Sequence, residues 1–375
     1  MTNESIHTLL SRDVWCILGL PFDAVTLNDA ANHVRNSIET GERCFISTPN
    51  LNFAVTAQSD EAFFESVVQS DISLADGMPI VWLAKLLGIP LRERVAGSDL
   101  FSHLSEQSKS PKIKVFFFGG QPGVAAIAHE KLNQQSKGME SCGYIDPGFV
   151  SVEEMSRPDT IQVINQSNAD FLVVALGAKK GQQWIQHNKH QFEVPVYSHL
   201  GAVINFVAGH VERAPGVWQK AGLEWLWRIR QEPALWRRYL GDALRLINQM
   251  TTRVLPLVVY SYWLKKSVGA ELLSGKVVTE QGNPEIIRLS GAMCHPYLQP
   301  LQQALVANLH NTGSDISLDM AGVSYIDGAC IAKLLLFQGF LKRYGRALIF
   351  RNTPKRVYRL LKYSGVTDRF EILSG

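Results

Sequence analysis

The chain has 375 residues, of which 46% are hydrophobic and 19% are charged. This length predicts roughly two or three domains, and the apolar content is enough to fill real cores, which excludes a disordered or low-complexity protein. The 37 Lys and Arg residues nearly balance the 34 Asp and Glu residues, so the net charge is only +3. This balance argues against a dedicated nucleic-acid-binding protein, whose surface is usually strongly basic.

Cysteine usage and the absence of targeting signals predict a cytoplasmic protein. The cysteines are scattered and odd in number, which argues against a disulfide framework and a zinc site; they are Cys16, Cys44, Cys142, Cys294 and Cys330. The N-terminus shows no signal-peptide pattern. The longest apolar run near the middle, 254–264, is about half of the roughly 20 residues that a bilayer span needs. We therefore expect contact with a membrane without crossing it.

Residues 13–210 alternate short apolar strands with helical stretches. The strands are predicted at 14–19, 43–47, 71–74, 112–118, 170–176 and 194–200. Many of them end in a glycine or in an Asp-Gly turn. This alternation predicts a Rossmann-like α/β layered domain with a mostly parallel sheet, and ligands are expected where the carboxyl ends of the strands open.

Residues 211–266 have a different composition. They hold ten Lys and Arg residues against four Asp and Glu residues, and five of the eight tryptophans. Tryptophan and arginine on helices that also carry apolar faces suit a membrane interface rich in anionic lipid. The alternative is a helical lid that packs its tryptophans on the core and leaves its arginines in water.

The remainder of the chain predicts a second domain. Residues 267–276 have the composition of a linker, and 277–375 form a unit of ordinary domain size. Strands are predicted at 285–289, 315–320, 323–326 and 346–350, and helices at 300–308, 329–342 and from Pro354 onward. The pattern is a small β-α-β-α-β-α fold.

The residues that could carry chemistry do not form a familiar catalytic motif. The chain has no G-x-S-x-G elbow, no H-E-x-x-H and no full P-loop. The glycine-rich loop 119–123 follows a strand and could receive a phosphate, or could simply be a tight turn. Lys179 and Lys180 at an equivalent strand end could neutralise a diphosphate or be solvated. Asp76 lies between a strand and a helix, where it could face the same crevice or cap the helix.

Seven short motifs then occur in order along the chain. They are 18–23 (LGLPFD), 48–50 (TPN), 75–79 (ADGMP), 94–100 (RVAGSDL), 118–120 (FGG), 213–215 (RAP) and 222–225 (GLEW). Together they closely resemble the WecG/TagA/CpsF glycosyltransferases, glycosyltransferase family twenty-six, over about residues 14–245. Members transfer a sugar from a UDP-sugar to a sugar on undecaprenyl diphosphate, invert the anomeric carbon and need no metal. The resemblance implies this activity here, in bacterial exopolysaccharide or cell-surface polysaccharide synthesis at the inner face of the cell membrane, without a cofactor.

The resemblance also assigns roles to residues. It implies that Asp76 is the general base for the acceptor hydroxyl, that Thr48 and Asn50 line the sugar pocket, and that Arg94 meets a phosphate or a sugar carboxylate. The UDP donor is expected near Gly119, Gly120, Gln121, Gly177, Lys179, Lys180 and Gln182. The lipid diphosphate is expected at arginines of the basic appendage, since guanidinium groups suit phosphate; the candidates are Arg213, Arg228, Arg237 and Arg238.

Two departures from the family pattern leave the donor sugar open. Many members carry Pro-Lys-Gln-Glu where this chain has Lys179-Lys180-Gly181-Gln182, so Gly181 replaces a glutamine. Asn205 stands where many relatives have an aspartate. The donor could be an N-acetylhexosamine, a uronic acid or glucose.

The C-terminal region, 277–375, resembles a STAS domain, the fold of anti-sigma-factor antagonists, on the strand-to-helix signature at 318–327. Regulatory members follow the aspartate with Ser-Ser-Gly, whereas Asp327 is followed here by Gly328-Ala329-Cys330. Because no hydroxyl remains there for a kinase, we expect a separately folding domain that docks constitutively, to a protein partner or to the transferase part.

We therefore predict a transferase core over 1–210, a basic helical appendage over 211–266, a linker and a STAS-like domain. The alternative function is a non-catalytic scaffold that binds a UDP-sugar or a lipid intermediate and signals through the STAS domain. An NAD-dependent oxidoreductase is disfavoured because no G-x-G-x-x-G follows the first strand.

Overall fold

The computed structural model describes residues 3–211, 214–215, 218, 224–231, 233, 236–269, 275–279, 286–310 and 315–373. The chain forms two compact units. One unit comprises Val25–Val81 and Arg92–Ala243, and we call it the transferase unit after the resemblance of its motifs. The other comprises Met1–Ala24, Trp82–Leu91 and Leu244–Gly375, and we call it the STAS-containing unit for the same reason. These limits differ from the boundaries expected at 210 and 277, which follow changes in composition rather than contacts.

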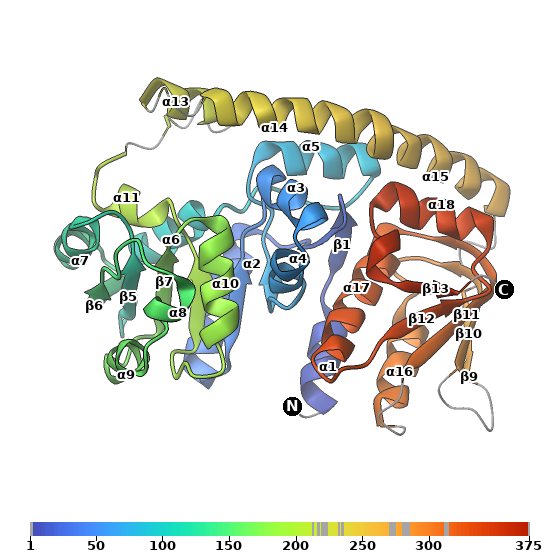
Figure 1. Cartoon of the computed structure of the whole chain (residues 1–375), viewed down its shortest axis with the longest axis horizontal. Helices are drawn as coiled ribbons and strands as arrows, with labels where there is room; N and C mark the ends of the chain where they lie inside the picture. Colours follow the sequence, from blue (N-terminus) through green and yellow to red (C-terminus); the bar gives the residue numbers. More distant parts are fainter. Residues whose placement is uncertain are drawn as a thin grey trace. The chain divides into compact units, whose positions relative to one another are not determined.

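A six-stranded sheet forms the centre of the transferase unit (Figure 1). Its strands, in spatial order, are β4 (Ile72–Ser73), β3 (Cys44–Ser47), β8 (Val196–His199), β7 (Phe171–Ala175), β5 (Ile113–Gly119) and β6 (Met139–Ile145). Every neighbouring pair is parallel, so all six carboxyl ends lie along one side of the sheet. We call this side the carboxyl edge. The predicted α/β fold class is confirmed.

Both faces of this sheet are covered, which explains its continuous apolar strands. Val115 and Phe117 of β5 belong to one core, and Phe116 and Phe118 to the other. Helices α2 (Leu27–Thr40), α6 (Gly97–Glu106), α7 (Val124–Gln135) and α11 (Val203–Val207) pack on the first face. Helices α8 (Val152–Met155), α9 (Pro158–Gln166) and α10 (Ala178–Asn188) pack on the second. Further described helices are α3 (Leu51–Ser59), α4 (Glu61–Val68), α13 (Glu224–Gln231) and α5 (Met78–Leu87), whose residues from Trp82 onward belong to the STAS-containing unit.

The expectation that residues 14–19 form the first strand of the alternating α/β series is wrong. β1 (Val14–Ile17) pairs antiparallel with β2 (Leu20–Asp23) in a separate two-stranded sheet. The intervening Leu18 and Gly19 both have positive φ, 51° and 86°. Two such residues make the tight turn that folds a hairpin back on itself, so the segment cannot continue as a strand of the large sheet.

The STAS-containing unit has a five-stranded sheet in the order β13 (Glu371–Leu373), β12 (Leu348–Arg351), β11 (Ile316–Ile326), β10 (Ile286–Met293) and β9 (Lys276–Thr279). Only the β9–β10 pair is antiparallel. Its helices include α16 (Gln299–Ala307), α17 (Gly328–Lys342) and α18 (Lys355–Ser364). β11 is one strand where we expected two, because Gly322 is accommodated at an irregularity in the register opposite Ser290.

The N-terminal segment belongs to this unit. Helix α1 (Asn3–Ser11) and the β1–β2 hairpin contact α17, of whose 15 residues 12 are buried. The Lys333 ammonium donates hydrogen bonds to the main-chain oxygens of Leu10, at 2.6 Å, and Arg12, at 2.7 Å. A Cβ atom on Gly328 would lie 3.4 Å from the main-chain oxygen of Cys16. The helix that follows the STAS signature is therefore covered by this chain's own first residues.

The basic appendage is helical over its described residues from Trp236 onward. α14 (Trp236–Gln249), the π-helical segment η2 (Met250–Val254) and α15 (Leu255–Val268) follow one another without a break. The predicted linker therefore begins inside α15, and its residues 270–274 lie outside the described residues. Within the described part of the chain, no helix combines the length and apolar character needed to span a membrane.

Candidate active site

Three of the predicted site residues lie on adjacent strand ends at the carboxyl edge. Thr48 and Asn50 follow β3, and Asp76 follows its neighbour β4. The two loops are joined by a hydrogen bond of 3.1 Å from the Asp76 N–H to the Pro49 carbonyl. Thr48 is buried, whereas Asn50 and Asp76 are partly exposed. The topology thus places the carboxylate of Asp76 at the same edge as the Thr48 hydroxyl and the Asn50 amide, which precede it by 28 and 26 residues in the sequence.

Asn50 also has a structural task. Its side-chain oxygen accepts a hydrogen bond of 3.1 Å from the Phe53 N–H and so caps α3. An N-cap of this type satisfies one of the unpaired amides at a helix start. Replacing Asn50 would therefore remove the cap of α3, so loss of activity in such a variant would not by itself prove that Asn50 contacts a ligand.

Arg94 is held by protein carboxylates. Its Nη1 lies 2.5 Å from Glu224 and its Nη2 2.5 Å from Asp99, and its side chain is 14% exposed. Burial lowers the Arg94 pKa, but the charges of Asp99, Glu224 and Asp76 outweigh this effect and raise it. Arg94 therefore links Glu224, at the start of α13, to Asp99 of α6. The charge of Asp76 also acts on it. The sequence analysis missed the roles of Asp99 and Glu224, although both belong to the conspicuous 94–100 and 222–225 motifs.

The glycines at the ends of β5 and β7 have backbone reasons to be glycine. Gly119, Gly120 and Gly177 all have positive φ, at 98°, 104° and 78°. A Cβ atom on Gly119 would lie 2.7 Å from the Ala175 oxygen, which also accepts a 2.8 Å hydrogen bond from the Gly120 N–H. The ends of these two parallel strands therefore lie too close together for a side chain at position 119. Gln121 is exposed.

The two lysines at the start of α10 both contact protein groups. Lys179 lies 2.6 Å from the Asp60 carboxylate, and Lys180 donates a hydrogen bond to the Val150 oxygen. Gln182, in contrast, is fully buried, and its Nε2 donates to the Ser47 hydroxyl at 3.2 Å. Of these three side chains, Gln182 is the one that reaches the end of β3.

The arginines proposed for the lipid diphosphate are only partly described. Arg213 lies outside the described residues, and Arg228 and Arg238 lie on α13 and α14 with side chains that are not described. Arg237 is exposed on α14, with its Cζ 5.7 Å from the centre of the Trp236 ring. This cation–π geometry matches the pairing of arginine with tryptophan noted in the sequence.

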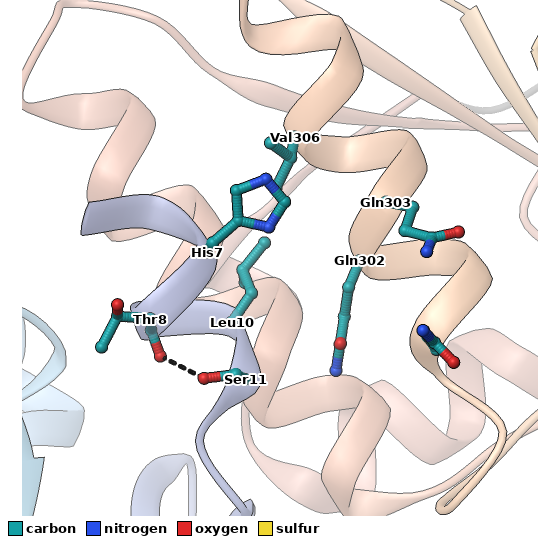
Figure 2. A pocket seen from close by; sticks show the side chains of 8 residues that line it. His7, Thr8, Leu10, Ser11, Gln302, Gln303 and Val306 are labelled. Carbon is teal, nitrogen blue, oxygen red and sulfur yellow. Dashed lines mark hydrogen bonds between the residues drawn. The ribbon is translucent and has the colours of Figure 1, made fainter. Parts of the chain in front are cut away.

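Two hollows lie in the STAS-containing unit and contain none of these residues. One, of about 330 Å³, lies between α1 and α16 (Figure 2). Its lining is His7, Thr8, Leu10, Ser11, Gln299, Gln302, Gln303 and Val306. The other, of about 370 Å³, is lined by Thr252, Arg253, Lys362, Tyr363, Gly365, Thr367 and Asp368. Among the described residues, no three His, Cys, Asp or Glu side chains are placed to hold a metal ion.

The family model for WecG/TagA/CpsF glycosyl transferases matches residues 15–256. The chain belongs to this family. Residues 277–374 match a second family model, described as an MlaB-type STAS domain. This WecG/TagA/CpsF member is therefore a glycosyltransferase with a C-terminal STAS domain, and both predictions are confirmed.

Three relatives of the chain carry the same enzyme name. The chain is 31% identical over 223 residues to the N-acetylglucosaminyldiphosphoundecaprenol N-acetyl-beta-D-mannosaminyltransferase of Bacillus spizizenii, covering 59% of this chain and 85% of that protein. The Bacillus subtilis enzyme of the same name is 30% identical, over 52% and 75% of the two chains. The Staphylococcus aureus enzyme of that name is 25% identical, over 59% and 85%.

Proposed function

We propose that this protein transfers a sugar from a UDP-sugar to a sugar carried on undecaprenyl diphosphate, inverting the anomeric carbon without a metal. The polymer is a bacterial exopolysaccharide or another cell-surface polysaccharide. The observation that carries the proposal is the match over residues 15–256 to a family whose relatives are named for transfer onto N-acetylglucosaminyl-diphosphoundecaprenol. The adjacency of Asp76, Thr48 and Asn50 at the carboxyl edge supports it.

The proposed chemistry needs one base and a site for the leaving group. Asp76 takes the proton from the acceptor hydroxyl, whose oxygen attacks the anomeric carbon. The bond from that carbon to the diphosphate oxygen breaks, and UDP leaves with the electron pair. Main-chain N–H groups at the starts of α7 and α10 stabilise the departing charge. The residues proposed there remain Gly119, Gly120, Gln121, Gly177, Lys179, Lys180 and Gln182.

We also propose that the protein works at the inner face of the cell membrane. α14 and α15 expose large apolar side chains, among them Leu244, Ile247, Val259, Tyr262 and Trp263. The same helices carry Arg237, Arg245, Lys265 and Lys266. Exposed apolar groups combined with cations suit the surface of an anionic bilayer, where the acceptor lipid is held.

Binding to vesicles that contain anionic lipid is expected to weaken as salt rises, because surface attraction is screened over about 8 Å at physiological ionic strength. The Ile247→Asp variant places a charge on the exposed face of α14, where Ile247 is 60% exposed, and should reduce sedimentation with vesicles. Phe149→Asp is the matched control, because Phe149 is 85% exposed but lies outside these helices. Equal losses in the two variants, or binding that salt does not change, would contradict the membrane surface.

The function itself is tested by incubating the full chain with a panel of UDP-sugars and undecaprenyl-diphosphate-linked N-acetylglucosamine. We expect one lipid-linked disaccharide and release of UDP. Failure of every donor and acceptor, together with a rise in the melting temperature on adding UDP-sugar, would instead support the non-catalytic scaffold, since a ligand that binds only the folded chain stabilises it.

A further inference from the structure

One hollow of the STAS-containing unit contains no residue that the proposed transfer reaction uses. Its volume is about 370 Å³, and small-molecule sites usually have volumes of roughly 300–1,000 Å³. Thr252 and Arg253 of η2 form one wall, and the other lining residues lie between Lys362 and Asp368. That second wall is the end of α18 with the 3₁₀ turn η5 (Thr367–Arg369). Both walls belong to the segment Leu244–Gly375 of one compact unit.

Arg253 brings an unsatisfied cation to this hollow. Its Nη1 is buried and has no hydrogen-bond partner among the described residues. A Cβ atom on Gly365 would lie 2.4 Å from this nitrogen, so the guanidinium rests directly on the glycine that ends α18. The Gly365 and Val366 N–H groups already donate to two main-chain oxygens in the last turn of α18, at 3.1 Å each. A buried donor without a partner carries a desolvation cost, and native proteins retain few of them.

The backbone of η2 is unusual where it carries this arginine. The Leu255 N–H donates to the Met250 oxygen, five residues back, which is the hydrogen bond of a π-helix. Such turns are rare and frequently occur at functional sites. η2 packs against α18, and Val254, next to Arg253, is 2% exposed. The valine therefore anchors the turn in the core, while its neighbour is held at the hollow.

The charges around the hollow favour an anion. Arg253 and Lys362 line it together with one carboxylate, that of Asp368. Among the described residues, neither cation forms an ion pair with Asp368, whose carboxylate accepts a hydrogen bond of 3.4 Å from the Thr367 hydroxyl. α18 has no acidic residue and carries three further cations: Lys355, Arg356 and Arg359.

A phosphate group suits this lining better than a carboxylate does. A guanidinium presents its donors as a planar fork that matches phosphate oxygens, and Lys362 adds a second cation. A phosphate ester has three acceptor oxygens and a charge of about −1.5 to −2 at pH 7, so it can balance both cations in spite of Asp368. The Tyr363 and Thr367 hydroxyls of the lining are further donors.

We propose that this hollow binds the phosphate group of a phosphorylated ligand, with Arg253 as the main contact. The site is separate from the residues proposed for UDP and for the lipid diphosphate, all of which belong to the transferase unit. The inference therefore does not depend on the transfer reaction. The phosphate can belong to a phospholipid headgroup or to a soluble phosphate ester. α14 and α15, which we propose lie on the membrane, flank η2 directly, so a headgroup is within the reach of this surface.

The first part of the test follows the melting temperature of the full chain as inorganic phosphate is added at constant ionic strength. In the wild type it should rise by about 3–6 °C at roughly ten times the dissociation constant. Arg253→Gln should need about 10–100-fold more phosphate for the same rise, because hydrogen bonds to a charged group are lost. A guanidinium that only supports α18 would instead give a lower melting temperature without phosphate and the same rise with it, which would overturn the site.

Lys355→Gln is the matched control. It removes one exposed cation from α18 but none from the lining, so its phosphate response should equal that of the wild type. This comparison also accounts for the general stabilisation that phosphate gives through exclusion from protein surfaces. Equal losses in Arg253→Gln and Lys355→Gln would mean unspecific attraction and would overturn the site.

Asp368→Asn should have the opposite effect. Removing the carboxylate of the lining should tighten phosphate binding by about 1.5–5-fold, since exposed charges couple weakly. Weaker phosphate binding in this variant would contradict an anion site, because Asp368 would then assist the ligand instead of repelling it.

Vesicles distinguish the two sources of the phosphate. Arg253→Gln and Lys355→Gln each remove one positive charge, so both lose the same general attraction to an anionic surface. The vesicles consist of phosphatidylcholine with added phosphatidylglycerol. A loss of sedimentation that is several-fold larger in Arg253→Gln assigns the site to a lipid headgroup. Equal losses, together with the Arg253-dependent response to inorganic phosphate, assign it to a soluble phosphate ester.

Discussion

Asp76→Asn is expected to fold normally, to bind UDP and to lose about 10²–10⁴-fold in transfer rate, because the amide cannot accept the proton of the acceptor hydroxyl. The change keeps the size of the side chain, and the main-chain hydrogen bond from residue 76 to Pro49 does not depend on the carboxylate. The measurement is single-turnover transfer to the lipid-linked acceptor, with UDP binding followed separately by calorimetry.

A matched control shows whether the loss of transfer is specific to the Asp76 carboxylate or follows the removal of any negative charge from this unit. Asp159→Asn removes an exposed carboxylate from α9 of the same unit and should leave transfer unchanged. Because the Asp76 charge also acts on Arg94, a structural effect would appear as a lower melting temperature and weaker UDP binding. Near wild-type turnover of Asp76→Asn with the true acceptor would remove Asp76 from the mechanism.

Removal of residues 1–24 is expected to unfold the STAS-containing unit. Six large apolar side chains of this segment are at most 1% exposed: Ile6, Leu10, Val14, Ile17, Leu20 and Phe22. Each contributes about 1.5–3 kcal/mol when buried. Together they are comparable with the whole free energy of unfolding of a domain, about 5–15 kcal/mol. The deletion would also leave Lys333 buried at α17 without its two carbonyl partners.

Limited proteolysis of the truncated chain measures this effect. Cleavage within 315–373 should become rapid, and the melting transition of this unit should disappear. Deletion of residues 1 and 2 alone is the control and should change neither. If the chain that begins at Val25 kept 315–373 protected from protease, the STAS domain would be self-contained, as the sequence analysis expected.

The sequence by itself determined the architecture of each half and the identity of the family. The apolar strands predicted from the sequence appear in the structure as β3, β4, β5, β7 and β8, because buried parallel strands must be apolar on both faces. The edge strand β6 was not predicted from the sequence, because its residues, MESCGYI, include polar residues and a glycine among the apolar ones. The order of the motifs was sufficient to identify the family. The structure places Thr48, Asn50 and Asp76 after two adjacent strands, and their roles stay predictions.

Only the tertiary structure decided which residues that are distant in sequence pack against each other. The match to the transferase family begins at residue 15, yet the β1–β2 hairpin packs on α17 of the STAS domain, because both have apolar surface that neither can bury alone. Likewise, the sequence shows Gly181 only as a departure from the family pattern. In the structure, a Cβ atom at this position would lie 2.2 Å from the Cδ2 atom of His199. Local propensity and spacing carry no information on such pairs, since the close packing that couples them exists only once the strands are arranged side by side.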